Sequence, residues 1–254
     1  MDLKNAVGIV TGSSSGVGAA TARLLASKGC NVVVNYSRSE DAALKVAEEC
    51  KAMGVEVLCC KANVAEDDDC RRMVGEAMDK WGKIDALVNN AGTTTFVPHH
   101  NLDGLSKQDF FDIYGVNVVG PYQMTRAAEV GMRKSGNAAV VNVDSVAGVY
   151  GVGSSIAYAA SKGALLTMTK SLARVLGPEI RVNAVCPAFI QGDWLAAGLG
   201  KERYEKSKAL LESRSPLQLT CSPETVAESI LQFIEGHSVI TGQHIILDGG
   251  DHLV

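Results

Sequence analysis

Long apolar runs are missing from this sequence: nowhere does it contain the roughly 18 consecutive apolar residues that a membrane-spanning helix needs. Clusters of Lys or Arg are also missing, and 24 basic against 28 acidic residues give a formal net charge of -4. This balance argues against nucleic acid as a partner. The N-terminal stretch MDLKNAVGIV has an acid at position 2 and lacks the layout of a signal peptide. We therefore expect a cytoplasmic protein without a membrane or nucleic-acid partner.

Metal-ligand spacing is lacking too. His99 and His100 have no acid or thiol at ligand spacing, and the cysteines form no CxxC pair. We expect reduced, mostly buried thiols and no metal site. The seven cysteines stand at positions 30, 50, 59, 60, 70, 186 and 221.

No Pro-, Ser- or charge-rich linker divides the chain, and it contains no repeat of 20 to 50 residues and no low-complexity tract. Its 254 residues are 46% hydrophobic, enough to bury a sizeable core. This length suits one large α/β domain or two small ones. Without a linker, we favour one domain over residues 1–254.

Short apolar runs alternate with amphipathic stretches along the chain. Continuous apolar character indicates strands that are covered on both faces, and Gly at the ends of the amphipathic stretches is typical of helix stops. Seven strands alternating with helices predict an α/β fold with a doubly wound parallel sheet. The expected strands are 6–10, 31–35, 56–60, 85–89, 138–143, 181–185 and 244–248, with helices including 18–29, 40–54 and 67–82.

Ligands of such sheets bind beyond the carboxyl ends of the strands, so the residues after each strand matter most. After the first strand comes TGSSSGVG, where glycines allow a tight turn and a close approach to a pyrophosphate at a helix N-terminus. The spacing is GxxxGxG, which is weak by itself and gains weight from the strand before it and the helix after it. The nucleotide-binding candidates are Gly12, Ser14, Ser15, Gly16, Val17 and Gly18.

After the second strand, dinucleotide sites usually carry an acid that binds the adenosine 2'-hydroxyl. Here Asn35, Tyr36, Ser37 and Arg38 occupy that place, and Glu40 comes late. Arg38 and Ser37 are able to bind a 2'-phosphate that an acid would repel, so NADP(H) is preferred over NAD(H). The alternative is that Arg38 is a solvated loop charge and that both cofactors bind.

The segments after the third and fourth strands complete an extended ligand site. Asn63 and Val64 follow the third strand, where an adenine would lie. The NNAG stretch supplies Asn90, Ala91 and Gly92 after the fourth. Each segment alone reads as a turn, but together they are consistent with one nucleotide.

Tyr158 and Lys162 are four residues apart in the small-residue stretch YAASK, so they share one helix face. An ammonium group nearby favours the phenolate, which makes the phenol a general acid/base. Lys162 is also placed to hold the nicotinamide ribose. A YxxxK pair is often only a surface pair, but Ser145 ends the fifth strand and can donate a hydrogen bond to a substrate oxygen.

In this order, TGSSSGVG, NNAG, Asn117, Ser145, YAASK and CPAFI resemble the short-chain dehydrogenase/reductase family over nearly the whole chain. The resemblance implies a Rossmann-like sheet, a homotetramer and a substrate lid at about 189–215. It implies that Pro187 and the backbone of Ile190 contact the nicotinamide. It also implies a catalytic tetrad of Asn117, Ser145, Tyr158 and Lys162, in which Asn117 holds a water that links the lysine to solvent.

Two features depart from the family pattern. Ala188 stands where a Gly is usual, and Gly192 stands where a Thr would contact the nicotinamide carboxamide. This puts cofactor affinity or lid closure in doubt, not the chemistry. Asp144 precedes Ser145 where a small residue is common; by strand alternation its side chain points away from Ser145, and we interpret it as structural.

We therefore expect reversible hydride transfer between NADP(H) and a carbonyl/alcohol pair. The pattern is most similar to 3-oxoacyl-carrier-protein reductases, so an acyl thioester is one candidate substrate. Trp194 is either a substrate wall or simple packing. The alternatives are an NAD-linked alcohol, sugar or steroid dehydrogenase and a nucleotide-binding regulator without turnover.

Overall fold

A seven-stranded parallel sheet forms the centre of the computed structural model, which describes residues 1–236 and 238–254. The strand order is β3-β2-β1-β4-β5-β6-β7, and it confirms the predicted doubly wound sheet. All seven apolar runs expected to be strands are strands, with bounds that differ by at most two residues. They are β1 (Val7–Val10), β2 (Asn31–Tyr36), β3 (Val57–Lys61), β4 (Ala86–Asn89), β5 (Ala138–Val143), β6 (Ile180–Pro187) and β7 (His244–Leu247).

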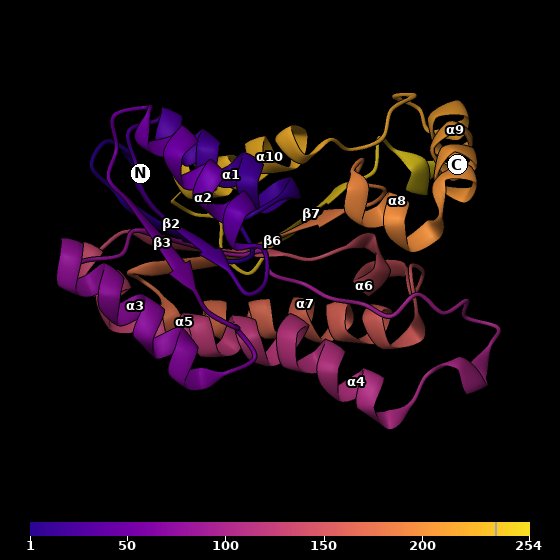
Figure 1. Cartoon of the computed structure of the whole chain (residues 1–254), viewed down its shortest axis with the longest axis horizontal. Coiled ribbons are helices and arrows are strands. Elements are labelled where there is room, and N and C mark those ends of the chain that lie inside the picture. The colour runs from indigo at the N-terminus through magenta and orange to yellow at the C-terminus, as the bar shows by residue number, and fades with distance from the viewer. Residues whose placement is uncertain (237) are drawn as a thin grey trace.

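Helices cover both faces of the sheet. Figure 1 shows α1, α2 and α10 on one side and α3, α4, α5 and α7 on the other. Three short turns complete the elements: η1 (Leu102–Gly104), the π-helical η2 (Gly115–Val119) and η3 (Asp251–Leu253). The helices are α1 (Gly16–Ser27), α2 (Glu40–Lys51), α3 (Asp67–Trp81), α4 (Lys107–Tyr114), α5 (Gly120–Ser135), α6 (Val146–Tyr150), α7 (Ile156–Leu176), α8 (Asp193–Leu199), α9 (Lys201–Arg214) and α10 (Pro223–Glu235).

The core lies in two layers, one on each face of the sheet. Val10 belongs to the layer under α1 and α10, and its neighbour Ile9 belongs to the layer over α3 and α5. Successive side chains of a strand point to opposite faces, so both faces need apolar residues. This explains why every residue of β1, β4, β5 and β6 is buried and why most of these residues are apolar.

The glycine stops and the acidic run act at helix ends as expected. Gly29, Gly54 and Gly82 have positive φ, and Gly82 is the left-handed C-cap of α3. The acids Asp67, Asp68 and Asp69 form the first turn of α3, where the helix dipole favours negative charge.

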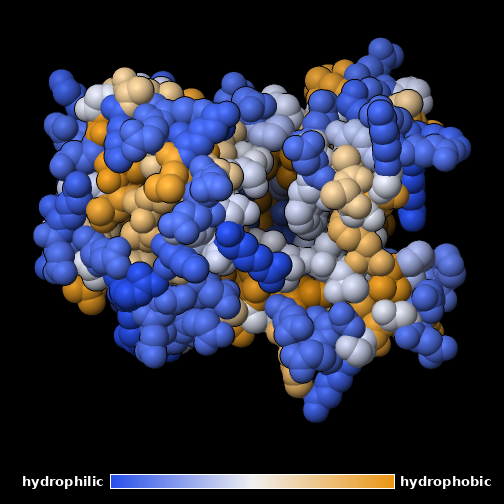
Figure 2. All heavy atoms as spheres, viewed as in Figure 1, coloured by the Kyte–Doolittle hydropathy of each residue, from blue (hydrophilic) through white to orange (hydrophobic). Residues whose placement is uncertain are grey.

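The order of the strands reverses between β1 and β4, and because all strands are parallel, the segments that follow them begin at the same edge of the sheet. Figure 1 shows α6, α8, α9 and the C-terminus together at one end of the molecule. In the same view, Figure 2 shows a hollow between the α8–α9 pair and the rest of the surface. Among the described helices, none has the length and apolar character that a membrane span requires.

Candidate functional site

The loop after β1 is shaped by glycines. Gly12 and Gly16 have φ of +61° and +53°, in the left-handed region that favours glycine. At Gly18, a Cβ would lie 2.5 Å from both Asn90 Nδ2 and Gly12 O, so glycine is required for this close approach. Ser15 precedes α1 without a side-chain cap bond, and the first turn of α1 has no acid. The helix N-terminus is therefore open to an anion.

Two amide side chains hold this loop in place. Asn35 is 1% exposed; its Oδ1 accepts from Gly12 N at 2.9 Å, and its Nδ2 donates to Ala62 O at 3.0 Å. Asn90 Nδ2 donates to the carbonyls of Thr11 and Gly12 at 2.9 and 3.0 Å. Both asparagines were predicted to bind the cofactor. The structure gives them a supporting contact to the loop, while direct contact stays a prediction.

The segment after β2 reaches the surface at once. Tyr36 is buried and packs into the core under α1 and α2, whereas Ser37 and Arg38 are both exposed. Glu40 is the first residue of α2. The guanidinium that we predict to bind a 2'-phosphate therefore belongs to an exposed residue.

The loops after β3 and β4 border the glycine loop and α5. Asn63 is exposed, and Val64 is 4% exposed beneath Gly120, where a Cβ would lie 2.8 Å from Val64 Cγ2. A Cβ on Gly12 would lie 2.9 Å from Ala91 Cα, so the loops after β1 and β4 touch. The predicted nucleotide residues therefore come from neighbouring loops.

Asn117 lies in the π-helical turn η2 and is 0% exposed. Its Oδ1 accepts from Thr93 N at 2.9 Å, and its Nδ2 donates to Thr93 O and Ser161 Oγ, both at 3.0 Å. A Cβ on Gly92 would lie 3.6 Å from the same Oδ1. Turns of this kind are rare and frequent at functional sites. Asn117 thus joins the segment after β4 to α7. Its contact on α7, Ser161, is the residue before Lys162.

Tyr158 and Lys162 share one face of α7, as their spacing predicts. Helix α7 is capped by Ser155, whose Oγ accepts from Tyr158 N at 3.2 Å. Lys162 is 4% exposed, and its Nζ lies 5.6 Å from the centre of the Tyr158 ring. The ammonium donates to Val143 O at 2.8 Å. It is therefore held between the phenol and the end of β5.

Ser145 follows β5 and caps α6. It is 9% exposed, and its Oγ accepts from Ala147 N at 3.1 Å and donates to Pro187 O at 3.4 Å. Its own backbone N–H donates to Asp144 Oδ1 at 2.8 Å. The expectation that Asp144 simply turns away from Ser145 is thus incomplete, because its carboxylate binds the serine backbone.

The two residues that depart from the family pattern, Ala188 and Gly192, lie in the segment after β6. Ala188 N donates to Leu247 O at 2.9 Å, and Ile190 forms a parallel bridge with Cys221. Gly192 has φ of +144°, which side chains rarely adopt, and its N–H donates to the Tyr204 hydroxyl at 3.2 Å. A Thr at position 192 would therefore strain this backbone.

The predicted lid contains α8 and α9 and contacts the loop after β4 through aromatic residues. The rings of Phe96 and Trp194 are 5.7 Å apart, although Trp194 is 56% exposed. At Gly198, a Cβ would lie 2.0 Å from Phe96 Cε2, so α8 sits directly on this ring. Phe189 and Tyr204 pack at 5.1 Å. Contact between the lid and Phe96 therefore depends on a glycine.

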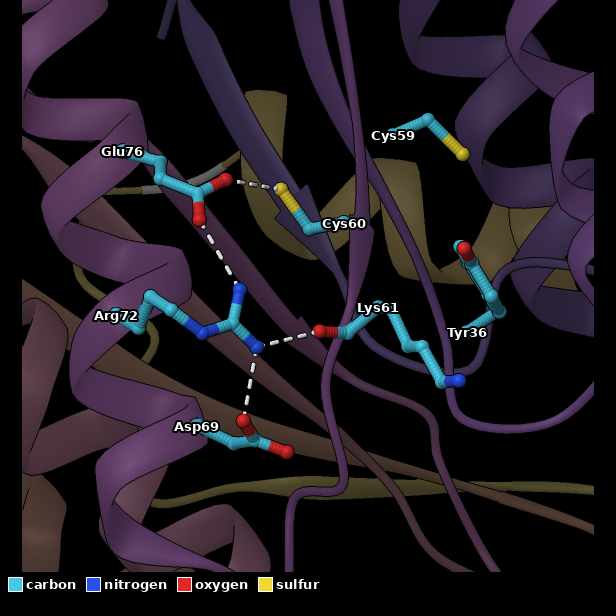
Figure 3. A pocket seen from close by; sticks show the side chains of 7 residues that line it. All are labelled: Tyr36, Cys59, Cys60, Lys61, Asp69, Arg72 and Glu76. Atoms are coloured by element: carbon cyan, nitrogen blue, oxygen red, sulfur yellow. Dashed lines mark hydrogen bonds and ion pairs between the residues drawn. The ribbon is translucent and has the colours of Figure 1, made fainter.

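A separate surface hollow lies at the outer edge of the sheet, where β3 meets α3 (Figure 3). Arg72 donates there to Asp69 at 2.8 Å, to Glu76 at 3.0 Å and to Lys61 O at 2.5 Å. Cys60 Sγ donates to Glu76 at 3.1 Å. Because the guanidinium is engaged within the protein, this hollow is a poor anion site.

The cysteines are all free, and six of the seven are buried. Cys186, which lies in β6 beside the site, is 0% exposed, and burial raises the pKa of its thiol to about 12. The thiol is therefore neutral at ordinary pH. Among residues 1–236 and 238–254, no group of three His, Cys, Asp or Glu side chains is placed to hold a metal.

Ser161 and Thr93 were not predicted from the sequence, and Asp144 was interpreted as structural without a contact to Ser145. Ser161 and Thr93 hold Asn117, and Asp144 holds Ser145. Their contacts join segments that are distant in sequence or pass through backbone atoms. The one available signal was that each adjoins a predicted site residue.

Comparison with known proteins agrees with this architecture. Residues 12–252 match the family model described as "Enoyl-(Acyl carrier protein) reductase". The "Granaticin polyketide synthase putative ketoacyl reductase 2" of Streptomyces violaceoruber is 40% identical over 248 residues, covering 98% of this chain and 96% of that protein. The 3-oxoacyl-[acyl-carrier-protein] reductase FabG of Staphylococcus aureus is 34% identical over 247 residues, covering 96% and 97%.

Solved structures are similar over almost the whole chain. The crystal structure of a "putative short-chain dehydrogenase/reductase" from Burkholderia xenovorans has a TM-score of 0.91 and 39% identity, covering 98% of this chain and 99% of that one. A NAD+-bound xylitol dehydrogenase has a TM-score of 0.89 and 25% identity, covering 98% and 100%. The chain belongs to the short-chain dehydrogenase/reductase family and is an oxidoreductase.

Proposed function

We propose that this enzyme reduces a carbonyl group with NADP(H), using Tyr158 as the general acid. The observation that carries the proposal is Lys162, a 4% exposed lysine whose ammonium lies 5.6 Å from the centre of the Tyr158 ring. A buried ammonium is costly, and a phenol one helical turn away gives it a chemical use. Ser145, at the end of the neighbouring strand, supplies a hydroxyl for the same substrate oxygen.

The residues around the predicted nucleotide site suit a dinucleotide. The N-terminus of α1 is open, whereas α4, α7 and α10 are capped by serine side chains. Gly12 and Gly18 leave the spaces that side chains would fill. We propose that the loop of residues 12–18 holds the pyrophosphate and that Arg38 and Ser37 hold a 2'-phosphate. Asn63, Val64, Ala91 and Gly92 border the adenine side, and Pro187 and Ile190 border the nicotinamide.

Each catalytic side chain then has a distinct task. When bound, the nicotinamide supplies the hydride to the carbonyl carbon. Tyr158 gives its proton to the carbonyl oxygen, and Ser145 donates a hydrogen bond that stabilises the charge developing there. Lys162 favours loss of the phenol proton in the reverse direction and holds the ribose. Asn117, held in place by Thr93 and Ser161, holds a water that links Lys162 to solvent.

The curated relatives favour an acyl thioester as the carbonyl substrate, because two of them are named as ketoacyl reductases. A second candidate is NAD-linked oxidation of a sugar alcohol, which the similarity to the NAD+-bound xylitol dehydrogenase favours. Membership of an oxidoreductase family disfavours the other alternative, a nucleotide-binding regulator without turnover. One domain, a cytoplasmic location and a homotetramer stay predictions; light scattering that finds a monomer would contradict the tetramer.

The test is a panel assay with both cofactors. We expect oxidation of NADPH with a 3-oxoacyl thioester and weaker activity with NADH. The panel includes simple ketones, an enoyl thioester, sugars and steroids, and the reverse direction uses NAD+ with xylitol. NADPH binding without turnover on any member would contradict the enzyme proposal and favour the regulator. Activity with the enoyl thioester alone would contradict carbonyl reduction.

A further inference from the structure

Asp144 is a buried acid at the reaction centre to which the proposed mechanism gives no task. It is 2% exposed, and its backbone N–H donates to Val185 O at 2.8 Å, which extends the β5–β6 pairing by one residue. Its Oδ1 accepts from the Ser145 backbone N–H at 2.8 Å. Its Oδ2 is buried and has no hydrogen-bond partner among the described residues. Buried polar atoms without partners are rare in folded proteins, so the unpartnered Oδ2 of Asp144 needs an explanation.

The charges around this carboxyl come from the neighbouring elements. Burial raises the pKa of Asp144 to about 7, while the ammonium of Lys162 on α7 and the Ser145 N–H act in the opposite direction. On β6, Cys186 has a thiol pKa of about 12, raised by burial, so it contributes no charge at neutral pH. On α7, the Lys162 ammonium donates at 2.8 Å to the carbonyl of Val143, the residue before Asp144. Lys162 is therefore the charged group that opposes an ionised Asp144.

We propose that Asp144 is a positioning residue of the reaction proposed above: its carboxyl fixes the Ser145 backbone, and its ionisation sets how much positive charge Lys162 presents to Tyr158. An ionised Asp144 offsets the ammonium and disfavours the phenolate. A neutral Asp144 leaves the charge of Lys162 to act in full. The pH range of the enzyme then depends on a third titrating group behind the Tyr158–Lys162 pair.

Two substitutions separate the two parts of this role. Asp144→Asn removes the charge and retains an oxygen that accepts from Ser145 N–H. Asp144→Ala removes both. We expect Asp144→Asn to keep the maximal kcat within about threefold and Asp144→Ala to lower it by about tenfold, because the serine loses its support. Equal kcat values for both variants and wild type would overturn the positioning part.

The pH profile tests the charge. Ketone reduction needs the protonated phenol, so its rate falls on the alkaline side. Because Asp144 is ionised there, Asp144→Asn removes a negative charge, and the alkaline limb should move to lower pH by roughly one unit. The matched control is Asp85→Asn, a 6% exposed acid that accepts from Val7 N at 2.8 Å before β4. Asp85→Asn should leave the alkaline limb at its wild-type pH. An alkaline limb at the wild-type pH in Asp144→Asn would overturn the proposal.

A measurement without turnover keeps this proposal separate from the proposed function. Infrared difference spectra of wild type should show a protonated carboxyl band that disappears with a midpoint near 7. The band should be absent from Asp144→Asn and present in Asp85→Asn. Turnover without the band would overturn the role of Asp144. The band without turnover on any substrate would instead refute the proposed function.

Discussion

Helices α7 and α9 differ in how many of their residues are buried. Nine residues of α7 are buried, among them Lys162, and this helix carries both residues of the proposed acid/base pair. Helix α9 has no buried residue and carries surface ion pairs such as Lys206–Glu202. Local opening needs less free energy where few contacts are buried. We therefore expect the proposed chemistry to depend on the partly enclosed α7 and substrate entry to depend on the exposed α9.

The largest effect should come from the enclosed side. Replacing Lys162 by Met removes the ammonium beside Tyr158 and should lower kcat by about a thousandfold. Lys170→Met is the matched control, since Lys170 is exposed on the same helix. Steady-state kinetics with NADPH and the best carbonyl of the panel measure both. A kcat of Lys162→Met within twofold of the wild-type value would contradict the proposed catalytic role of Lys162 on α7.

An intermediate effect should appear at the cofactor end, outside both helices. Arg38→Gln removes the exposed guanidinium and should weaken NADPH binding by about tenfold, leaving NADH binding within twofold. Titration of each cofactor by fluorescence gives the two Kd values. Equal losses for NADPH and NADH would contradict the role of Arg38 in binding a 2'-phosphate.

A smaller effect should follow from disturbing the lid. Gly198→Ala places a Cβ 2.0 Å from Phe96 Cε2, so either α8 or the Phe96 ring must shift. We expect KM of the carbonyl substrate to rise by about fivefold with little change in kcat, because the acid/base pair is untouched. Phe96→Leu in the same chain should recover part of the loss. A fall in kcat with constant KM would show that the lid and the chemistry are coupled.

The smallest effect concerns the far end of α9. Arg214 binds Asp251 through Nε and Nη2 at 2.5 and 2.6 Å, but its side chain is 51% exposed. Arg214→Gln should lower the free energy of unfolding by about 0.5 kcal/mol, as is usual for solvent-exposed pairs. Lys206→Gln, in a more exposed pair, should change it less. Denaturant unfolding measures both, and a loss above about 2 kcal/mol for Arg214→Gln would mean that α9 is not the loosely held helix we describe.

The fold could be predicted from the sequence because strands buried on both faces of the sheet are visible as short apolar runs. Runs such as NVVVN and AAVVNV are continuous and apolar, and glycines mark the helix ends between them. The sequence also indicated which residues of the candidate site would share a helix face or end a strand, since Tyr158 and Lys162 are one turn apart and Ser145 comes at the end of a strand. These features depend on neighbours in the sequence.

The supporting contacts could not be predicted, because they depend on distant partners. Asn35 was predicted to contact the cofactor, and nothing local indicated that its amide also joins Gly12 to Ala62. The contact between Phe96 and Gly198 spans about a hundred residues and has no local pattern. Glycine at position 192 looked like a missing Thr; the φ of +144° shows instead a backbone that suits glycine.

Substitution of Tyr158 by Phe tests the central claim most directly. It removes one hydroxyl and keeps the ring that lies beside Lys162. With the best carbonyl substrate, we predict NADPH binding within twofold of wild type and turnover lower by about a thousandfold. Unchanged turnover in Tyr158→Phe would contradict the account, because the proton would then have to come from another group.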